Sequence, residues 1–425
     1  MKATIRPGNI EGNLRIPSSK SLMQRACAAA LLQKGETIIR YPGKSQDELA
    51  ALQMIQQLGA RILSDSDNEL KIISSGTVTP EAVINCGESG LACRLFTPIV
   101  AISERKVRIT GTGSLLNRPM DEFAQILPAM GVSLSGFTGR LPFTVQGPLK
   151  PGPLEIDGST SSQFLTGLLF AFAASTKEAI SIKVHNLVSK PYIDLTLQVL
   201  KHFKYDVEHK NYEQFQIKAS RHFNIESVVF EVESDWSSAA SFLVAAAIGG
   251  SVRLSGLSVD SMQSDRIISK LLEEAGASVT FLQDGDILVT GGDLKAFDFD
   301  ATHAPDLVPV LATLAAFCEG RSTIRGMSRL LHKESNRLVS VKAMLASFGV
   351  EHYSEEDTLV IEGGQMVQPA VVDSFNDHRI VMAASIMSLR SEASVVITGA
   401  EAVNKSYPEF FLHLQHLGAE VVFGD

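Results

Sequence analysis

Apolar and polar positions alternate along this chain in a pattern that recurs about every 70 residues. One complete copy spans residues 306–350. A continuous apolar run predicts a buried helix over 306–317, and residues 322–325 read as a strand. After a polar loop, apolar residues at helical spacing predict an amphipathic helix that ends at Gly349.

The end of the amphipathic helix marks six copies of this unit. Five copies carry a glycine between two apolar residues, and the remaining copy has Lys204 at that place. Glycine suits the residue after a helix because this position often has a positive φ. The five glycines are Gly59, Gly131, Gly276, Gly349 and Gly418. Six copies divide most simply into two domains of three.

Each copy also contains a helix with an apolar body and a polar start. Residues 26–32, 164–174 and 242–248 are apolar all round, which is typical of a buried helix. The polar starts are Ser18–Ser21, Gly87–Gly90, Ser161–Gln163, Asp235–Ser238, His303–Asp306 and Asn376–Arg379. The last of these combines a general-base candidate with an arginine.

A basic residue precedes the amphipathic helix in every copy: Lys44, Arg118, Lys190, Arg266, Lys333 with Arg337, and Lys405. Helix N-termini expose unpaired N–H groups and attract anions. If the buried helices run parallel within each half, their starts and these loops share one face and form an anion site. The alternative is that the polar starts are ordinary caps and the cations are solvated. Recurrence in six copies favours the anion site for the set.

Composition limits the classes of function. The chain has 425 residues, 45% hydrophobic and 20% charged, as in ordinary globular proteins. A net charge of −9 argues against binding to nucleic acid or an anionic membrane. The four cysteines lack metal-ligand spacing, and the first 20 residues lack a secretory apolar segment. We therefore expect a cytoplasmic protein with reduced core thiols and no metal.

The cations outnumber the carboxylates among the candidate site residues. Arginine and lysine bind phosphate and carboxylate groups, so the cluster suits small substrates with several negative charges. Its members are Lys20, Arg25, Arg94, Arg118, Lys333, Arg337, Arg379 and Lys405. Asp306 and Glu334 stand out as proton-transfer groups, and nearby cations are expected to lower their pKa values and favour a base role.

In this order, the motifs resemble those of one family over nearly the whole chain: 5-enolpyruvylshikimate 3-phosphate synthase, also called 3-phosphoshikimate 1-carboxyvinyltransferase. The motifs are Pro17–Ser21, Gly87–Arg94, Arg118–Met120, Ser161–Phe164, Ser189–Tyr192, Lys333–Arg337, Asn376–Arg379 and Lys405–Pro408. Each alone is weak, but together they are specific.

The resemblance implies an α/β fold of two inverse, barrel-like domains, each with three βαβαββ repeats and buried parallel helices. Residues 1–16 would belong to the C-terminal domain (234–425), and residues 17–233 would form the N-terminal domain. The domains would close over the substrates and exclude water. The implied reaction transfers the enolpyruvyl group of phosphoenolpyruvate to the 5-hydroxyl of shikimate 3-phosphate and releases phosphate, in the pathway to chorismate and aromatic amino acids. We expect a monomer without a cofactor.

The resemblance also implies residue roles. Shikimate 3-phosphate would be held by Lys20, Ser21, Arg25, Ser161, Ser162, Gln163, Ser189, Tyr192, Asp306 and Lys333. Phosphoenolpyruvate would be held by Lys20, Gly90, Arg118, Gln163, Arg337, Arg379 and Lys405. Asp306 would take the 5-hydroxyl proton, and Glu334 and Lys20 are candidates for delivering a proton to the methylene carbon.

Four residues depart from the family pattern: Ser18, Leu91, Trp236 and Asn336. Two alternatives compete with this interpretation. The sister family, UDP-N-acetylglucosamine enolpyruvyltransferase, carries a cysteine shortly before an Arg-Pro pair, and residues 113–119 contain none. A non-catalytic polyanion-binding scaffold would need the cations but neither Asp306 nor Glu334.

Overall fold

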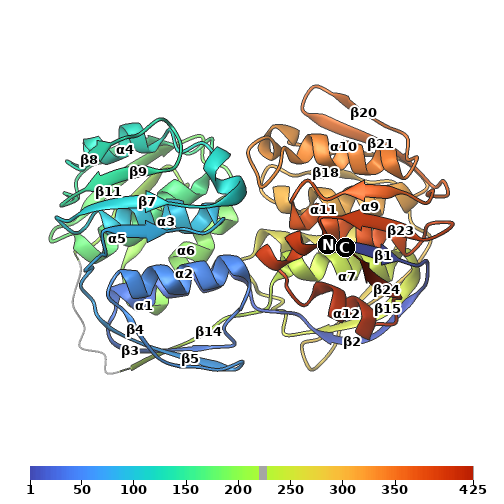
Figure 1. The fold of residues 1–425 in the computed structure, drawn as a ribbon, viewed down its shortest axis with the longest axis horizontal. Helices are drawn as coiled ribbons and strands as arrows, with labels where there is room; N and C mark the ends of the chain where they lie inside the picture. The colour runs from blue at the N-terminus through green and yellow to red at the C-terminus, as the bar shows by residue number, and fades with distance from the viewer. Residues whose placement is uncertain (220–226, 425) are drawn as a thin grey trace. The chain divides into compact units, whose positions relative to one another are not determined.

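The computed structural model describes residues 1–219 and 227–424, which form two compact units (Figure 1). The inserted unit comprises Ser18–Glu233, and the terminal unit comprises Met1–Pro17 together with Ser234–Asp425. The chain therefore starts in the terminal unit, builds the inserted unit, and returns.

Each unit consists of three βαβαββ repeats, and within the described residues the strands form six four-stranded sheets. In the second repeat, β6 (Val83–Asn85) lies parallel to β7 (Lys106–Thr110), and the buried helix α3 (Gly90–Val100) connects them. After α4 (Phe123–Ala129), the strands β8 (Ser133–Ser135) and β9 (Phe143–Gln146) complete the sheet order β6-β7-β9-β8. This arrangement confirms the predicted fold class.

The other elements of the inserted unit repeat this order. They are α1 (Lys20–Leu32), β3 (Lys34–Arg40), α2 (Gln46–Gln57), β4 (Arg61–Asp65), β5 (Glu69–Ser75), η1 (Gly113–Asn117), β8 (Ser133–Ser135), β9 (Phe143–Gln146), β10 (Leu154–Asp157), α5 (Ser162–Ser175), β11 (Ile180–His185), α6 (Lys190–His202), β12 (Val207–Lys210), β13 (Gln214–Ile217) and β14 (Ser227–Glu231).

The terminal unit contains the remaining elements. They are β1 (Lys2–Ile5), β2 (Ile10–Arg15), α7 (Trp236–Gly249), β15 (Gly250–Ser255), η2 (Ser264–Arg266), α8 (Ile267–Glu274), β16 (Ser278–Phe281), β17 (Ile287–Thr290), β18 (Asp298–Asp300), η3 (Pro305–Leu307), α9 (Val308–Phe317), β19 (Gly320–Arg325), η4 (Met327–Leu330), α10 (Arg337–Ser347), β20 (His352–Glu355), β21 (Thr358–Gly363), β22 (Val371–Asp373), α11 (His378–Ser388), β23 (Val395–Thr398), η5 (Ala400–Lys405), α12 (Phe410–His416) and β24 (Val421–Gly424).

Strands from distant parts of the chain complete three of the sheets. In the inserted unit, β14 pairs in parallel with β3. In the terminal unit, β2 pairs in parallel with β15, and β1 lies antiparallel between β23 and β24. The first residues of the chain thus complete the first and the last repeats of the terminal unit.

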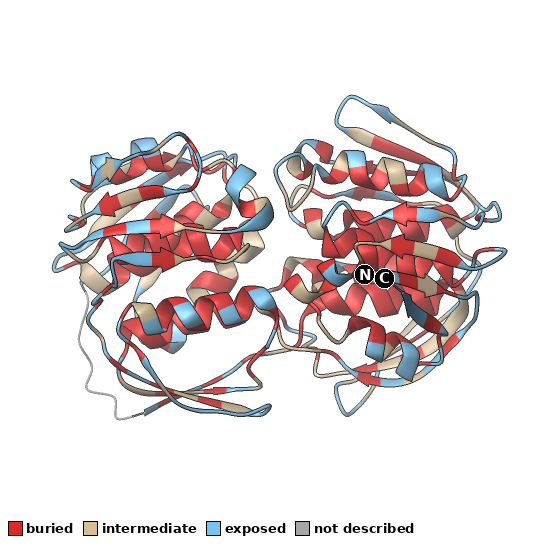
Figure 2. Ribbon diagram, viewed as in Figure 1, coloured by how far each residue is buried: buried red, intermediate tan, exposed pale blue. Residues whose placement is uncertain are grey.

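The helices with apolar bodies form the centres of the two cores, as predicted. Residues from α1, α3 and α5 belong to the core of the inserted unit, and residues from α7, α9 and α11 belong to the other core (Figure 2). All four cysteines are buried free thiols. The helix predicted to begin at Asp306 begins instead with a 3-10 turn, in which the Val308 N–H donates to the Pro305 carbonyl. Within the described residues, no helix combines the length and apolarity needed to span a bilayer.

The predicted backbone geometry after the amphipathic helices is also confirmed. All five glycines have positive φ, from 72° at Gly349 to 106° at Gly59. Lys204 takes the same left-handed conformation, with φ of 66°, although it carries a side chain. The copy that contains Lys204 therefore keeps the turn of the other five copies without their glycine.

Candidate functional site

The starts of the buried helices in the inserted unit meet through side-chain hydrogen bonds. Ser89 caps α3 and donates to Gln24 Oε1 of α1 at 3.0 Å. Arg94 of α3 donates to Gln163 Oε1 at the start of α5, at 2.8 Å. These contacts join the N-terminal ends of α1, α3 and α5, so the three helices run parallel as expected.

Arg94 fixes two of the predicted substrate-binding segments. Its other terminal nitrogen donates to the Pro119 carbonyl at 2.8 Å, and its guanidinium lies 5.0 Å from the centre of the Phe164 ring. Because the Gln163 carbonyl accepts from Arg94, the orientation of its amide is defined. Arg94 is buried, so it serves here to hold Gln163 and the loop beside Arg118.

Gly90 and Arg118 lie in close contact. A Cβ added to Gly90 would lie 2.4 Å from Arg118 Nη1, so a larger residue would displace the guanidinium. The loop that carries Arg118 is held by Glu88, whose carboxylate accepts from both the N–H and the hydroxyl of Ser114 at 3.0 Å. The sequence motif therefore combines a glycine that admits Arg118 with an acid that positions its loop.

The first turns of α1 present Lys20 and bury Arg25. Lys20 forms an ion pair with Asp47 at 3.0 Å, although no sequence motif pointed to Asp47 as its partner. Arg25 donates to the Thr196 hydroxyl and to the carbonyls of Ser21 and Tyr192, at 2.7–3.1 Å. Burial lowers the pKa of Arg25 to about 10, so the guanidinium remains charged at neutral pH.

The hydroxyl-bearing candidates lie at helix starts. Ser161 caps α5 and accepts from the Gln163 N–H at 3.3 Å, and Ser162 begins the helix. Ser189 is the residue before α6 and has a left-handed conformation with φ of 53°. Because Tyr192 accepts from Arg25 through its carbonyl, α1 and α6 are joined beside Ser21.

The basic residues that precede the amphipathic helices differ in their surroundings. Lys44 is exposed and pairs with Asp67. Arg266 is also exposed and donates to the Val259 carbonyl, while Lys190 lies against the Tyr212 ring. In the loops of Lys44 and Arg266, a nearby carboxylate is buried instead.

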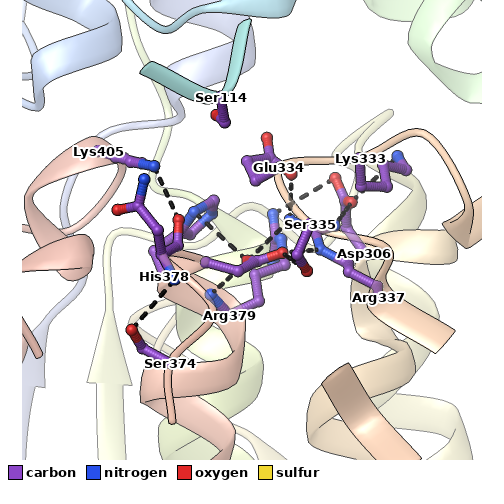
Figure 3. Close-up of polar contacts among 12 residues, drawn as sticks. Ser114, Asp306, Lys333, Glu334, Ser335, Arg337, Ser374, His378, Arg379 and Lys405 are labelled. Carbon is purple, nitrogen blue, oxygen red and sulfur yellow. Dashed lines mark hydrogen bonds and ion pairs between the residues drawn. The ribbon is translucent and has the colours of Figure 1, made fainter. Parts of the chain in front are cut away.

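In the terminal unit, Arg337 is the centre of an ion-pair network (Figure 3). Its side chain is 1% exposed and donates to Asp377 Oδ2 at 2.8 Å, to Asp306 Oδ1 at 2.6 Å and to Glu334 Oε2 at 2.5 Å. Burial alone lowers the pKa of Arg337, but Asp377, Glu334 and Asp306 together raise it well above its usual value. Arg337 therefore joins the starts of α9, α10 and α11.

Three cations contact the carboxylate of Asp306. Lys333 Nζ lies 3.2 Å from Oδ1, and Arg379 Nη2 lies 3.4 Å from Oδ2, in addition to the Arg337 contact. The Asp306 side chain is 21% exposed, whereas Asp377 is fully buried and caps α11. Of these two carboxylates, Asp306 is the one open to a ligand.

Lys405 and Asp265 complete this region. Lys405 is buried, and its ammonium donates to the Asn376 carbonyl at 2.7 Å (Figure 3). Asp265 is buried near Asp306 and Arg379, and burial followed by the charge of Asp306 raises its pKa to about 6. No sequence motif pointed to Asp265, because the neighbouring Arg266 is the residue that matches the recurring basic position.

Three of the four departures make specific contacts. The Ser18 hydroxyl donates to the Tyr41 carbonyl at 2.5 Å, and the Trp236 indole N–H donates to the Ser258 carbonyl at 3.1 Å. Asn336 caps α10 by accepting from the Val339 N–H. Leu91 is buried near the start of α3, and nothing in the structure explains this choice of residue.

Comparisons with known proteins agree on one family. The family model described as EPSP synthase (3-phosphoshikimate 1-carboxyvinyltransferase) matches residues 5–414. A 3-phosphoshikimate 1-carboxyvinyltransferase of Clostridium acetobutylicum is 37% identical over 421 residues, covering 98% of this chain and 97% of its own. The relative in Clostridium novyi is 35% identical over 422 residues, with 97% and 96% covered.

Solved structures show the same fold. An EPSP synthase from Acinetobacter baumannii superposes with a TM-score of 0.83 and 27% identity, covering 99% of this chain and 100% of its own. The enolpyruvyl transferase NikO from Streptomyces tendae has a TM-score of 0.79, with 99% and 98% covered. At 17% identity, NikO supports the fold alone.

Proposed function

The chain belongs to the EPSP synthase family, and from this premise we propose that it transfers the enolpyruvyl group of phosphoenolpyruvate to the 5-hydroxyl of shikimate 3-phosphate. The single observation that supports this most strongly is the partly exposed carboxylate of Asp306 among three cations. A polyanion-binding scaffold needs no such group.

In the addition step, the 5-hydroxyl oxygen bonds to C2 of phosphoenolpyruvate while C3 gains a proton. In the elimination step, the resulting methyl group loses a proton and the C–O bond to phosphate breaks, which forms the enol ether product. The first step needs a base at the hydroxyl and an acid at the methylene carbon. We assign the base to Asp306 and keep Glu334 and Lys20 as candidates for the acid.

The inserted unit is assigned most of the shikimate 3-phosphate contacts. Its contributors are Lys20, Ser21, Arg25, Ser161, Ser162, Gln163, Ser189 and Tyr192, and the terminal unit adds Asp306 and Lys333. Helix N-termini and hydroxyls suit a phosphate ester and sugar-like hydroxyls. Because Arg25 is buried and donates to three protein groups, we assign it mainly to holding Ser21 and the start of α6 in place.

Phosphoenolpyruvate carries a phosphate and a carboxylate, which arginines bind bidentately. Its proposed contacts are Lys20, Gly90, Arg118 and Gln163 of the inserted unit, and Arg337, Arg379 and Lys405 of the terminal unit. Gly90 supports this assignment because it gives the Arg118 guanidinium room beside the start of α3. Arg337 is almost fully engaged with carboxylates, so Arg379 and Lys405 are the stronger contributors.

The test is a coupled phosphate-release assay with both substrates. We expect one phosphate per phosphoenolpyruvate consumed, and only when shikimate 3-phosphate is present. Turnover with UDP-N-acetylglucosamine instead would assign the chain to the sister activity. Tight binding of both anions without phosphate release would favour a scaffold. We also propose a cytoplasmic monomer, and light scattering coupled to gel filtration tests the monomeric state.

A further inference from the structure

Asp47 is a carboxylate to which the proposed reaction assigns no role. It is the second residue of α2, and its Oδ2 lies 3.0 Å from the Nζ of Lys20, the first residue of α1. The Lys20 side chain is 15% exposed and that of Asp47 is 11% exposed. Both helices belong to the inserted unit and pack against each other (Figure 1). The ion pair therefore joins a residue that acts in the proposed reaction to one that does not.

The start of α2 does not depend on Asp47 for its cap. A carboxylate at a helix start is often explained by the helix alone, because the N-terminal N–H groups attract negative charge. In α2 this role belongs to Glu48, whose Oε2 accepts from the Ser45 N–H at 2.8 Å and from the Ser45 hydroxyl at 2.6 Å. A Cβ added to Gly43 would lie 1.8 Å from Glu48 Oε1, so the turn before α2 fits closely around this carboxylate. Capping therefore explains Glu48, whereas the contact with Lys20 explains Asp47.

A second lysine–aspartate pair in the same repeat provides a contrast. Lys44 contacts Asp67 at 2.6 Å, but these side chains are 44% and 90% exposed. Exposed ion pairs contribute little, because water and salt screen them and both side chains lose conformational freedom on pairing. The pair of Lys20 and Asp47 is largely shielded from water, so its attraction is stronger. Asp47 therefore restrains the flexible four-carbon stem of Lys20.

Resting on the proposed function, we propose that Asp47 is a positioning residue that holds the Lys20 ammonium where it acts on phosphoenolpyruvate. A charged group contributes most to catalysis when its geometry is fixed before the reaction, and misplacement by about 1 Å can cost about 100-fold in rate. An ammonium has three N–H donors, so the contact with Asp47 is compatible with a bound anion. In this role Asp47 acts through Lys20 and does not touch the substrate.

Asp47→Asn tests the proposal because it keeps the shape of the side chain and removes its charge. We expect kcat to fall about tenfold, since the ammonium loses its restraint. The KM for phosphoenolpyruvate should stay within about twofold, since the positive charge of Lys20 remains. Asp47→Glu keeps the carboxylate and should recover most of the lost kcat. Added to Lys20→Met, Asp47→Asn should cause no further loss, because its effect requires Lys20.

Asp67→Asn is the matched control, because it removes the aspartate of the exposed pair in the same repeat and should leave kcat unchanged. Thermal denaturation confirms that each variant is folded. A wild-type kcat in the Asp47→Asn variant would overturn the proposal, as would a rise in KM for phosphoenolpyruvate with unchanged kcat. A further loss of kcat in the double variant would overturn it as well, because Asp47 would then act without Lys20.

A labelling measurement separates this proposal from the proposed function. Acetic anhydride acylates the neutral amine of a lysine, and peptide mass spectrometry gives the extent of reaction at Lys20. We expect Lys20 to react severalfold faster in Asp47→Asn than in the wild type, because the carboxylate stabilises the unreactive ammonium, and at the wild-type rate in Asp67→Asn. Equal labelling in Asp47→Asn and the wild type would overturn the positioning of Lys20 by Asp47. A wild-type protein without turnover that shows the expected labelling would instead refute the proposed function.

Discussion

Replacing Asp306 by Asn separates its proposed role as a base from the effect of its charge on substrate binding. The change removes the proposed base and retains the shape of the side chain. Arg337 keeps its contacts with Asp377 and Glu334, so the ion-pair network stays largely intact. The variant should therefore fold, and its effect should fall on the chemistry.

The structure predicts that kcat falls while the binding of both substrates is retained. Loss of a general base lowers the rate by about 100-fold or more, which corresponds to roughly 2.7 kcal/mol in the barrier. At the same time, Lys333, Arg337 and Arg379 lose the anion that they contact at 2.6–3.4 Å. Each such contact has a gross attraction of about 5–6 kcal/mol at an effective dielectric near 20, before screening. Anionic substrates should therefore bind at least as tightly as before.

Steady-state phosphate release measures both constants, with Asp293→Asn as a control because Asp293 is an exposed carboxylate of the same unit. We expect a large fall in kcat with KM unchanged or lowered for both substrates. If KM rises instead while kcat stays within a few-fold of the wild type, Asp306 is a binding residue and the assignment of the base is wrong.

Three further predictions concern stability. Arg337→Met leaves the buried carboxylate of Asp377 without its cation. In urea denaturation, the free energy of unfolding should fall by about 3–5 kcal/mol, and an added Asp377→Asn should restore much of this loss. Lys204→Gly should stabilise the fold by about 0.5–1 kcal/mol, because φ there is 66°; a lower denaturation midpoint would contradict this reasoning. Burial and the charge of Asp306 raise the pKa of Asp265 in the folded state from 3.8 to about 6, so this group favours folding at low pH and opposes folding as pH rises through about 6. Asp265→Asn should therefore increase the free energy of unfolding by up to about 3 kcal/mol above that pH, and should leave it unchanged below 3.8. Denaturation midpoints that do not depend on pH in this comparison would refute the last prediction.

Much of the fold follows from local patterns. The apolar bodies of the buried helices and the glycines after the amphipathic helices are determined by sequence neighbours, and both predictions are confirmed. Lys204 shows the limit of such a rule, because the surrounding repeat imposes a left-handed turn on a residue that does not favour it.

The candidate site was less predictable from the sequence, because inward and outward residues of a loop can be adjacent. Asp265 is buried and Arg266 is exposed, yet both are charged and both follow a serine-rich stretch. Which of them faces the site depends on how η2 packs against α7, a contact between segments far apart in the sequence. Likewise, the pairing of Arg94 with Gln163 and Pro119 required the positions of three separate segments.

The position of β1 between β23 and β24 has a consequence for biosynthesis. The inserted unit is a continuous stretch, so all of its strands have been translated by the time the ribosome passes Glu231. The sheet that contains β1 must instead wait for β23 and β24, which are translated long after β1. The nascent chain therefore carries β1 unpaired until those strands emerge, and deleting β24 should leave β1 with an open edge prone to aggregation.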